Sequence, residues 1–276
     1  GTAHNVRHGD VACIFGLSQI GDGLRYSSRT AERQDKLSTR FNHLAEILCE
    51  AVTWAKLEGA ELVTAEHIQK TIYEKEQRMK LYEEKLDEML EENVIMIDTE
   101  GAEIGQINGL AVLDMGNYAF GNPSRITATT YVGKSGIVNI EKEARLSGQT
   151  HDKGVQIITG FLGQTYAQNF PLSLSCRVCF EQNYNGIDGD SASSTELYCI
   201  LSSLAELPIR QDLAVTGSVN QKGEIQAIGG VTHKIEGFFD LCRKRGLTGT
   251  QGVIIPVSTV KDLVLKDEVV QAVKDG

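Results

Sequence analysis

The spacing of apolar residues changes near residue 93, and this change constrains the fold more than any other feature of the chain. Before it, apolar residues recur every three or four positions, which is the spacing of amphipathic helices. After it, short alternating or continuous apolar segments are separated by glycine-containing turns, which is typical of strands. We therefore predict a small all-α domain over residues 38–92, followed by a mixed α/β domain over residues 93–276. Residues 1–37 carry no pattern that assigns them to either domain.

The all-α region predicts two helices. The first is expected to end near Gly59 and to bury a stripe of apolar residues. The members of that stripe recur at helical spacing: Phe41, Leu44, Leu48, Val52 and Ala55. The second helix has an N-cap candidate in Thr64, and Val63 and Ile68 occupy the two positions of a hydrophobic staple. We expect it to continue through Met89 with a charged, solvated outer face.

In the α/β region an initial run of strands gives way to alternating helices and strands. Strands are expected over Val94–Asp98, Gln106–Leu113, Ser124–Val132, Gly136–Lys142, Leu172–Gln182, Leu213–Val219 and Gly252–Pro256. Helices are expected over His151–Ala167, Ser193–Leu207, Val231–Arg245 and Val257–Gly276. Cys176 and Cys179 form a C-x-x-C pair within one predicted strand, where their odd separation points the two sulfurs to opposite faces. Since no second such pair exists in the sequence, we predict no metal site.

Composition narrows the classes of protein to which the chain can belong. It has 276 residues, 41% of them hydrophobic, with a net charge of −10, as expected for a globular protein with an acidic surface. This charge argues against a broad basic face for nucleic acid. No apolar run reaches the ~20 residues of a membrane span, and no signal peptide is recognisable, so the default expectation is a cytoplasmic protein. The sequence contains no P-loop motif, so we expect no cofactor in this chain.

The segment NGIDGDSASSTE, residues 185–196, delivers a serine to the start of a predicted helix. Ser193 and Glu196 fit a capping box, which leaves Ser191 without a structural explanation. A helix N-terminus has unpaired backbone N–H groups, which could stabilise the oxyanion of a tetrahedral intermediate. Ser191 is therefore a candidate nucleophile.

The segment TGSVNQKGEIQAIGGVTHKIEGF, residues 216–238, places Lys234 in the first turn of a predicted helix. An exposed surface position is the usual fate of a lysine. At this end of a helix, however, the dipole penalises an exposed cation by about 0.3–1 kcal/mol. Burial would act in the same direction by lowering the pKa of the amine. A neutral lysine is a competent general base toward a serine hydroxyl.

Together these two segments resemble the proteolytic domain of the Lon protease family (endopeptidase La). The resemblance rests on GIDGDSASS, on the lysine-bearing segment and on GVIIP further along, and it extends from about residue 93 to about residue 265. It implies a Ser-Lys dyad, with Ser191 as nucleophile and Lys234, 43 residues later, as general base. Thr216 matches the position whose hydroxyl orients the lysine, although a threonine at a strand end also has a plain β-propensity explanation.

Asp188 and Asp190 match acidic or variable positions of the same motif. Asp188 could pair with Lys234 in a resting state, or either carboxylate could only shape the turn. KLSTRF and LEGAELVTAEHI, around residues 37–90, resemble the helical lid of the AAA+ module in archaeal-type Lon proteins.

The resemblance implies a fragment of an ATP-dependent protease that lacks its P-loop core, so ATP and Mg²⁺ would belong to that core. It also implies unfolded polypeptide substrates and a homohexameric ring in the intact protein. Two alternatives remain open: a non-catalytic Lon-fold scaffold of a DNA-processing ATPase, and a protease held in an inactive arrangement.

Overall fold

The computed structural model describes residues 4–8, 11–15, 17–116, 118–169 and 173–275, and their side chains from residue 23 onward. Contacts among these residues divide the chain into two compact units, and the division falls within one helix, at Lys85. None of the helices in these ranges is both long enough and apolar enough to cross a membrane.

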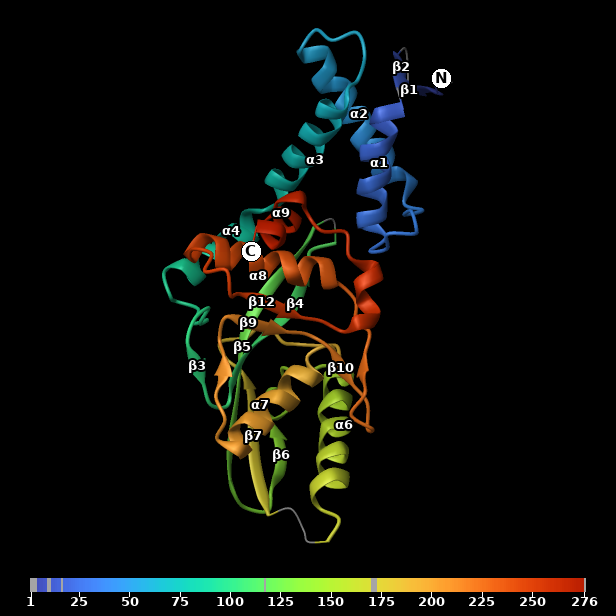
Figure 1. The fold of residues 1–276 in the computed structure, drawn as a ribbon. Coiled ribbons are helices and arrows are strands. Elements are labelled where there is room, and N and C mark those ends of the chain that lie inside the picture. Colours follow the sequence, from blue (N-terminus) through green and yellow to red (C-terminus); the bar gives the residue numbers. More distant parts are fainter. Residues whose placement is uncertain (1–3, 9–10, 16, 117, 170–172, 276) are drawn as a thin grey trace. The chain divides into compact units, whose positions relative to one another are not determined.

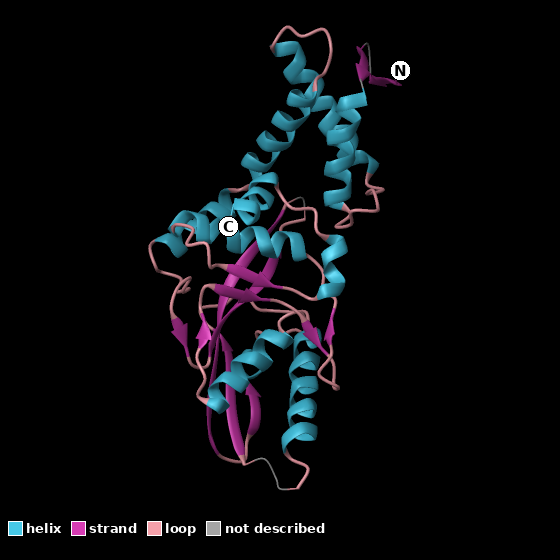
Figure 2. Cartoon of the chain, in the orientation of Figure 1, coloured by secondary structure: helices cyan, strands magenta, loops and turns pink. Residues whose placement is uncertain are grey.

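Unit 1 comprises residues 1–85 and the short segment 261–264, and its elements are mainly helices (Figure 2). They are β1 (His4–His8), β2 (Val11–Phe15), α1 (Leu17–Thr30), α2 (Phe41–Leu57), α3 (Ala65–Met79) and the start of α4 (Leu81–Glu91). Its core is built by α2 and α3 and the turn between them: Ile47, Ala51, Ala55, Val63 and Ile68. Because Val63 and Ile68 share this core, the predicted staple at the start of α3 is confirmed.

Two details of the predicted helices are wrong. Phe41 is 73% exposed, because it is the first residue of α2 and the buried stripe starts further along the helix, at Ile47. The second helix is not continuous but is broken at Lys80 into α3 and α4. Lys80 has φ −75° and ψ −9°, a turn-like conformation that interrupts the helix without the glycine or proline that would mark a break in the sequence.

Unit 2 comprises residues 86–260 and 265–276 and contains the predicted mixed α/β fold. Among the described residues, six strands form one mixed sheet in the order β12-β9-β4-β5-β7-β6. These strands are β4 (Gln106–Asp114), β5 (Ala119–Val132), β6 (Gly136–Asn139), β7 (Leu174–Phe180), β9 (Leu213–Val215) and β12 (Gly252–Ile254). The pairs β4–β5 and β5–β7 are antiparallel, whereas the pairs toward both edges are parallel.

Helices cover both faces of this sheet (Figure 1). Ile107 of β4 lies in a core with α6 (Gln149–Tyr166) and α7 (Ser193–Ala205). Leu110, three residues along the same strand, lies in a second core with α8 (Val231–Arg245). Side chains three residues apart on a strand point to opposite faces, so α7 and α8 sandwich the sheet between them.

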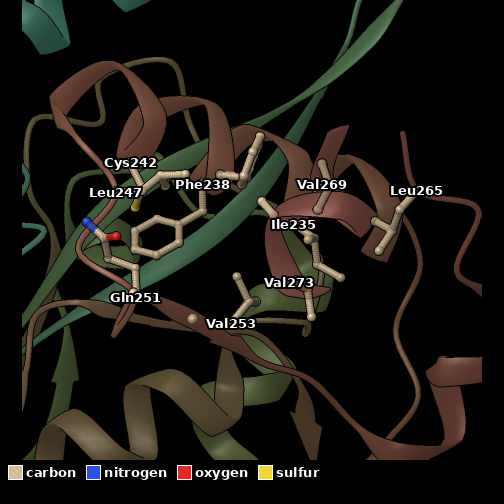
Figure 3. Close-up of a pocket in the computed structure, with 13 residues that line it drawn as sticks. Ile235, Phe238, Cys242, Leu247, Gln251, Val253, Leu265, Val269 and Val273 are labelled. Carbon is tan, nitrogen blue, oxygen red and sulfur yellow. The ribbon is translucent and has the colours of Figure 1, made fainter. Parts of the chain in front are cut away.

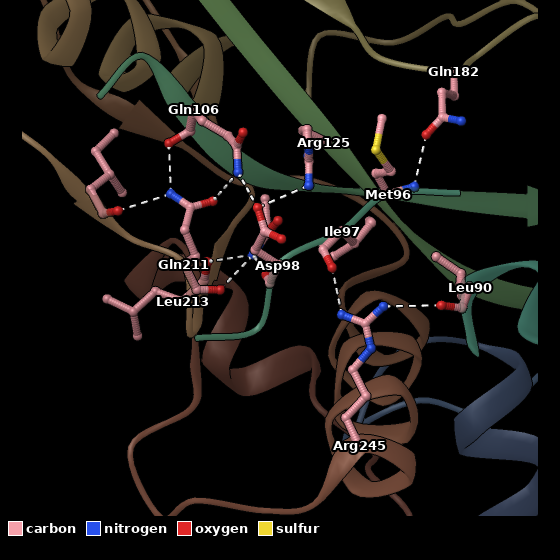
Figure 4. A network of polar contacts seen from close by, with 12 residues as sticks. Leu90, Met96, Ile97, Asp98, Gln106, Arg125, Gln182, Gln211, Leu213 and Arg245 are labelled. Carbon is pink, nitrogen blue, oxygen red and sulfur yellow. Dashed lines mark hydrogen bonds and ion pairs between the residues drawn. The ribbon is translucent and has the colours of Figure 1, made fainter. Parts of the chain in front are cut away.

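The segment Val94–Asp98 is not a strand, which corrects the prediction. Several of its backbone groups bond to side chains from distant parts of unit 2 instead of to a neighbouring strand (Figure 4). Gln182 accepts from Met96 N–H at 2.7 Å and donates to the carbonyl of Val94 at 2.7 Å. Arg245, at the end of α8, donates to the carbonyls of Leu90 and Ile97. Side-chain anchors of this kind satisfy the same backbone groups that a sheet would satisfy.

Other predicted elements are shorter than expected. The strand from Gly136 ends at Asn139, where α5 (Ile140–Glu143) begins. The segment Val257–Gly276 divides into the 3-10 helix η1 (Val257–Asp262) and α9 (Asp267–Asp275), and its last residue lies outside the described ranges, as does Leu172. Short two-stranded pairings complete the fold: β3 (Ala102–Glu103) with β8 (Ile209–Arg210), and β10 (Ser218–Val219) with β11 (Ile225–Gln226).

Candidate active site

Ser191 lies two residues before α7, and the first turn of that helix is completely buried. The N-cap of α7 is Ala192, and no side chain caps the helix there, so the predicted capping box is wrong. Ser193 Oγ instead accepts from the N–H of Val219 at 2.9 Å, and Glu196 bonds to His151. Buried side chains must find partners, and here the partners come from other elements of the unit rather than from the helix itself.

Lys234 is brought to Ser191 by the first turn of α8. Its side chain is 3% exposed, and Nζ lies 2.8 Å from Ser191 Oγ and 3.1 Å from Thr216 Oγ1. The Thr216 hydroxyl donates to the carbonyl of Ser191 at 3.2 Å, so its lone pairs face the amine. The structure therefore brings together the three residues that the two sequence segments singled out.

The predicted strand Leu213–Val219 is interrupted between β9 and β10, and this interruption contributes to the site. Thr216 N–H donates to Ile254, whereas Gly217 N–H donates to the carbonyl of Ser191 at 2.8 Å. A Cβ added to Gly217 would lie 2.8 Å from Ser194 Oγ, so the absence of a side chain at Gly217 lets the backbone approach the serine segment without displacing Ser194. At Gly217 the backbone therefore stops bonding to β12 and bonds to the Ser191 segment instead.

Two glycines that the sequence analysis did not select determine the position of Lys234. A Cβ on Gly121 of β5 would lie 2.0 Å from the carbonyl oxygen of His233 and 3.0 Å from Lys234 Cα. A Cβ on Gly237 of α8 would lie 2.2 Å from the carbonyl oxygen of Gly121. Helix and strand therefore touch backbone to backbone one turn from the lysine. The sequence did contain a signal that could have identified these residues: a glycine inside a strand or helix often marks close approach of two backbones.

The structure gives the two acidic residues of the motif different contacts. Asp188 Oδ1 accepts from the backbone N–H groups of Thr150 and His151, at 3.1 and 3.3 Å. Backbone donors at Gly189, His151 and Thr150 hold the pKa of the Asp188 carboxyl below its ordinary value. Asp190 Oδ2 accepts from Ser218 Oγ at 2.8 Å. Both carboxylates therefore contact backbone or hydroxyl groups of the segments around Ser191.

A buried pair next to the site was also missed by the sequence analysis. His151 and Glu196 are each 1% exposed, and His151 Nε2 lies 3.1 Å from Glu196 Oε1. Burial raises the pKa of the Glu196 carboxyl. Burial lowers the pKa of His151, but the hydrogen bond and negative charge of Glu196, together with the charges of Glu141 and Asp152, outweigh it, so the net shift is upward. The residues are 45 positions apart, and no local pattern connects them.

No group of three or more His, Cys, Asp or Glu side chains in the described ranges is arranged to hold a metal ion. Cys176 lies in the core of unit 2, where burial raises the pKa of its thiol to about 12. A cavity of about 430 Å³ lies between α8, α9 and the segment leading into β12 (Figure 3). Phe238, Val253 and Val269 are among its apolar lining, which does not include Ser191, Thr216 or Lys234.

Comparison with family models assigns both regions of the chain. Residues 24–78 match the AAA+ ATPase lid domain of archaeal LonB. Residues 177–276 match the C-terminal proteolytic domain of Lon protease (S16), a range that includes Ser191, Thr216 and Lys234.

Curated relatives carry related names. A Lon protease homolog of Escherichia coli (strain K12) is 42% identical over 225 residues, which is 80% of this chain and 38% of the relative. One of Haemophilus influenzae is 41% identical over 255 residues, 90% of this chain and 41% of the relative. An archaeal Lon protease of Pyrococcus abyssi is 30% identical over 272 residues, 92% of this chain and 24% of the relative. The chain thus spans less than half the length of these relatives, and it belongs to the Lon protease family, with an archaeal-type AAA+ lid followed by the S16 proteolytic domain.

Proposed function

We propose that the chain is a serine endopeptidase in which Ser191 is the nucleophile and Lys234 the general base. The observation that carries this proposal is the 2.8 Å contact between Lys234 Nζ and Ser191 Oγ. A serine hydroxyl becomes nucleophilic when a base lies within hydrogen-bond reach, and a neutral lysine is one such base. The match to the Lon proteolytic domain over residues 177–276 supports the same assignment.

In acylation, the neutral amine of Lys234 takes the hydroxyl proton while Ser191 Oγ bonds to the scissile carbonyl carbon. The carbonyl oxygen then carries the negative charge, and the backbone N–H groups of Ser191 and Ala192, which have no acceptor among the described residues, are available to stabilise it. The ammonium of Lys234 protonates the leaving amine as the C–N bond breaks. Water, deprotonated by the same amine, hydrolyses the acyl-enzyme and restores Ser191.

The environment of Lys234 favours the neutral amine that this mechanism requires. The side chain is buried and lies in the first turn of α8, and both conditions disfavour an ammonium ion. Thr216 fixes the direction of the amine without adding charge, because its hydroxyl proton is used on the carbonyl of Ser191. Thr216 is therefore proposed as the residue that orients the base.

The substrates we propose are unfolded polypeptides that bind as extended strands. We further propose a cytoplasmic protein that assembles as a hexameric ring in its intact form. ATP and Mg²⁺ would be used by a separate ATPase core, because this sequence contains no P-loop motif. With a net charge of −10, nucleic acid is not the ligand we propose.

Hydrolysis of an unstructured fluorogenic peptide tests the assignment of the dyad. Ser191→Ala and Lys234→Ala should each reduce kcat at least 100-fold, because each removes a group that makes or breaks bonds. Ser258→Ala and Lys153→Ala are matched controls at exposed positions and should retain wild-type rates. Full activity in Ser191→Ala would refute the proposal. A wild-type chain that hydrolyses no peptide at any alkaline pH would favour the non-catalytic scaffold instead.

A further inference from the structure

His151 contacts both ends of the segment that carries Ser191. At one end, its backbone N–H donates to Asp188 Oδ1, together with the N–H of Thr150. At the other end, its imidazole Nε2 lies 3.1 Å from Glu196 Oε1. The segment 188–196 therefore contacts α6 at its first residue, Asp188, and at its last residue, Glu196, and both contacts are made by His151. One residue of α6 thus holds both ends of the segment in which Ser191 lies.

The imidazole of His151 is itself fixed by its surroundings. Ser147 Oγ lies 3.0 Å from Nδ1, and Asn139 Nδ2 lies 3.3 Å from the same nitrogen. Phe180 meets the ring edge-on, with 5.4 Å between the ring centroids. Because both ring nitrogens and one ring edge have neighbours, the ring has one favourable orientation, and in that orientation Nε2 faces Glu196.

Glu196 depends on this single contact. Its Oε1 bonds to His151, whereas its buried Oε2 has no hydrogen-bond partner in the described part of the chain. A buried carboxylate that loses its only partner retains the whole cost of desolvation, and the surrounding structure must move to solvate it. Glu196 is in the first turn of α7, so such a movement would displace the helix start that follows Ser191.

We propose that His151 is a positioning residue for the nucleophile: its imidazole holds Glu196, its backbone N–H holds Asp188, and together these contacts set the location of Ser191 Oγ relative to Lys234 Nζ. Substitution of His151 removes only the imidazole contact, whereas substitution of Asp188 removes the other. This inference rests on the proposed function of Ser191. His151 itself does not touch the reacting atoms, and it acts through the two ends of the 188–196 segment. A displacement of about 1 Å at a reacting group is enough to reduce a rate by about 100-fold.

The test measures the rate at which a fluorophosphonate labels Ser191, together with kcat, KM and Tm. His151→Ala should reduce the labelling rate and kcat at least tenfold and leave KM within twofold, at temperatures well below Tm. His151→Gln places an amide N–H near the position of Nε2 and should recover most of the loss. The double variant His151→Ala/Glu196→Ala should be no slower than His151→Ala, because the two side chains act as one unit.

Asp188→Ala provides a second variant whose folding is not at risk, since Asp188 is exposed. It releases the other end of the segment and should reduce kcat severalfold with KM unchanged. Asp188→Asn keeps an acceptor oxygen and should restore the rate. Thr130→Val is the matched control: it removes the 2.8 Å hydrogen bond to Ser203 near the far end of α7 and should lower Tm without changing the labelling rate.

The results separate this inference from the proposed function. If Ser191 of the wild-type chain is not labelled, the proposed function fails. If Ser191 is labelled at the same rate in the wild type, in His151→Ala and in Asp188→Ala, only the positioning role is overturned, and the His151–Glu196 pair serves stability alone.

Discussion

At the scale of single residues, the site depends on two hydroxyl groups that lie within hydrogen-bond distance of the lysine amine. Thr216 Oγ1 lies 3.1 Å and Ser191 Oγ 2.8 Å from Lys234 Nζ, and the proton of Thr216 is directed to the carbonyl of Ser191. A hydroxyl adds no net charge beside the amine, whereas a carboxylate would favour the ammonium form. The hydroxyl of Thr216 therefore orients the amine while leaving its proton free to be lost.

Thr216→Val tests this role, because valine has the shape of threonine but no hydroxyl. We expect kcat to fall about tenfold, corresponding to about 1.4 kcal/mol of lost transition-state stabilisation. Thr216→Ser should recover most of the rate because it restores the hydroxyl. Equal kcat values for the valine variant and the wild type would show that the threonine is present only for β-propensity.

The pH dependence of hydrolysis tests the identity of the base. The active form carries a neutral Lys234, so kcat/KM should rise with pH and level off once the amine of the free enzyme is deprotonated. An unperturbed lysine titrates near pH ~10.4, and burial moves that value downward. A steady-state profile from pH 6 to 10 measures the transition. A rate independent of pH over this range would contradict a lysine base that titrates within it.

At the scale of elements, the distance between α8 and β5 determines where Lys234 lies. Gly121 and Gly237 allow the two backbones to touch, as no pair of larger residues could. α8 itself begins and ends where the periodicity predicted, at Val231 and Arg245. The distance between α8 and the sheet, however, depends on the contact between Gly121 and Gly237, which are more than 100 positions apart. Local sequence patterns do not encode such a contact.

Gly121→Ala should therefore impair the site more than it impairs the fold. The added methyl group would overlap the carbonyl oxygen of His233, so α8 must move outward and take Lys234 with it. Overpacking of this kind costs about 1–3 kcal/mol, and we expect a loss of kcat of at least tenfold in protein that remains folded at 25 °C. Gly163→Ala, in open space on α6, is the control and should not reduce activity. Unchanged hydrolysis in Gly121→Ala would contradict the positioning role of this contact.

Local patterns predicted the elements better than they predicted the partners of buried polar groups. The dyad and Thr216 were predicted because two short segments carry them in a recognisable order. Ser193 and Glu196 were misassigned to a capping box because the helix begins one residue earlier than that motif requires, with Ala192 as N-cap, and the two side chains bond to Val219 and His151 instead. Val94–Asp98 was misassigned because distant side chains satisfy its backbone.

At the scale of the whole molecule, the chain combines a lid domain and a proteolytic domain but spans less than half of its Escherichia coli and Haemophilus influenzae relatives. Residues 86–260, within unit 2, hold the complete candidate site, since Ser191, Thr216 and Lys234 all lie there. Nothing in the proposed chemistry consumes ATP. Energy would be needed only to unfold a substrate before it reaches Ser191.

Because peptide hydrolysis and substrate unfolding are separate steps, we expect the chain to hydrolyse an unstructured peptide without ATP. The rate should be the same when ATP and Mg²⁺ are added. A stably folded protein should remain intact under both conditions. The sequence has no P-loop motif, so we expect no ATP hydrolysis by this chain that could drive unfolding. Gel assays of a folded substrate and of its unfolded variant measure the difference. Stimulation of peptide hydrolysis by ATP would contradict this account.

The central claim is that Lys234 activates Ser191, and covalent labelling followed by mass spectrometry tests it most directly. A fluorophosphonate should modify Ser191 in the wild-type chain, and the rate should fall at least 100-fold in Lys234→Met, which fills similar space without an amine. Modification of another serine, or labelling of Ser191 at an unchanged rate in Lys234→Met, would contradict the claim.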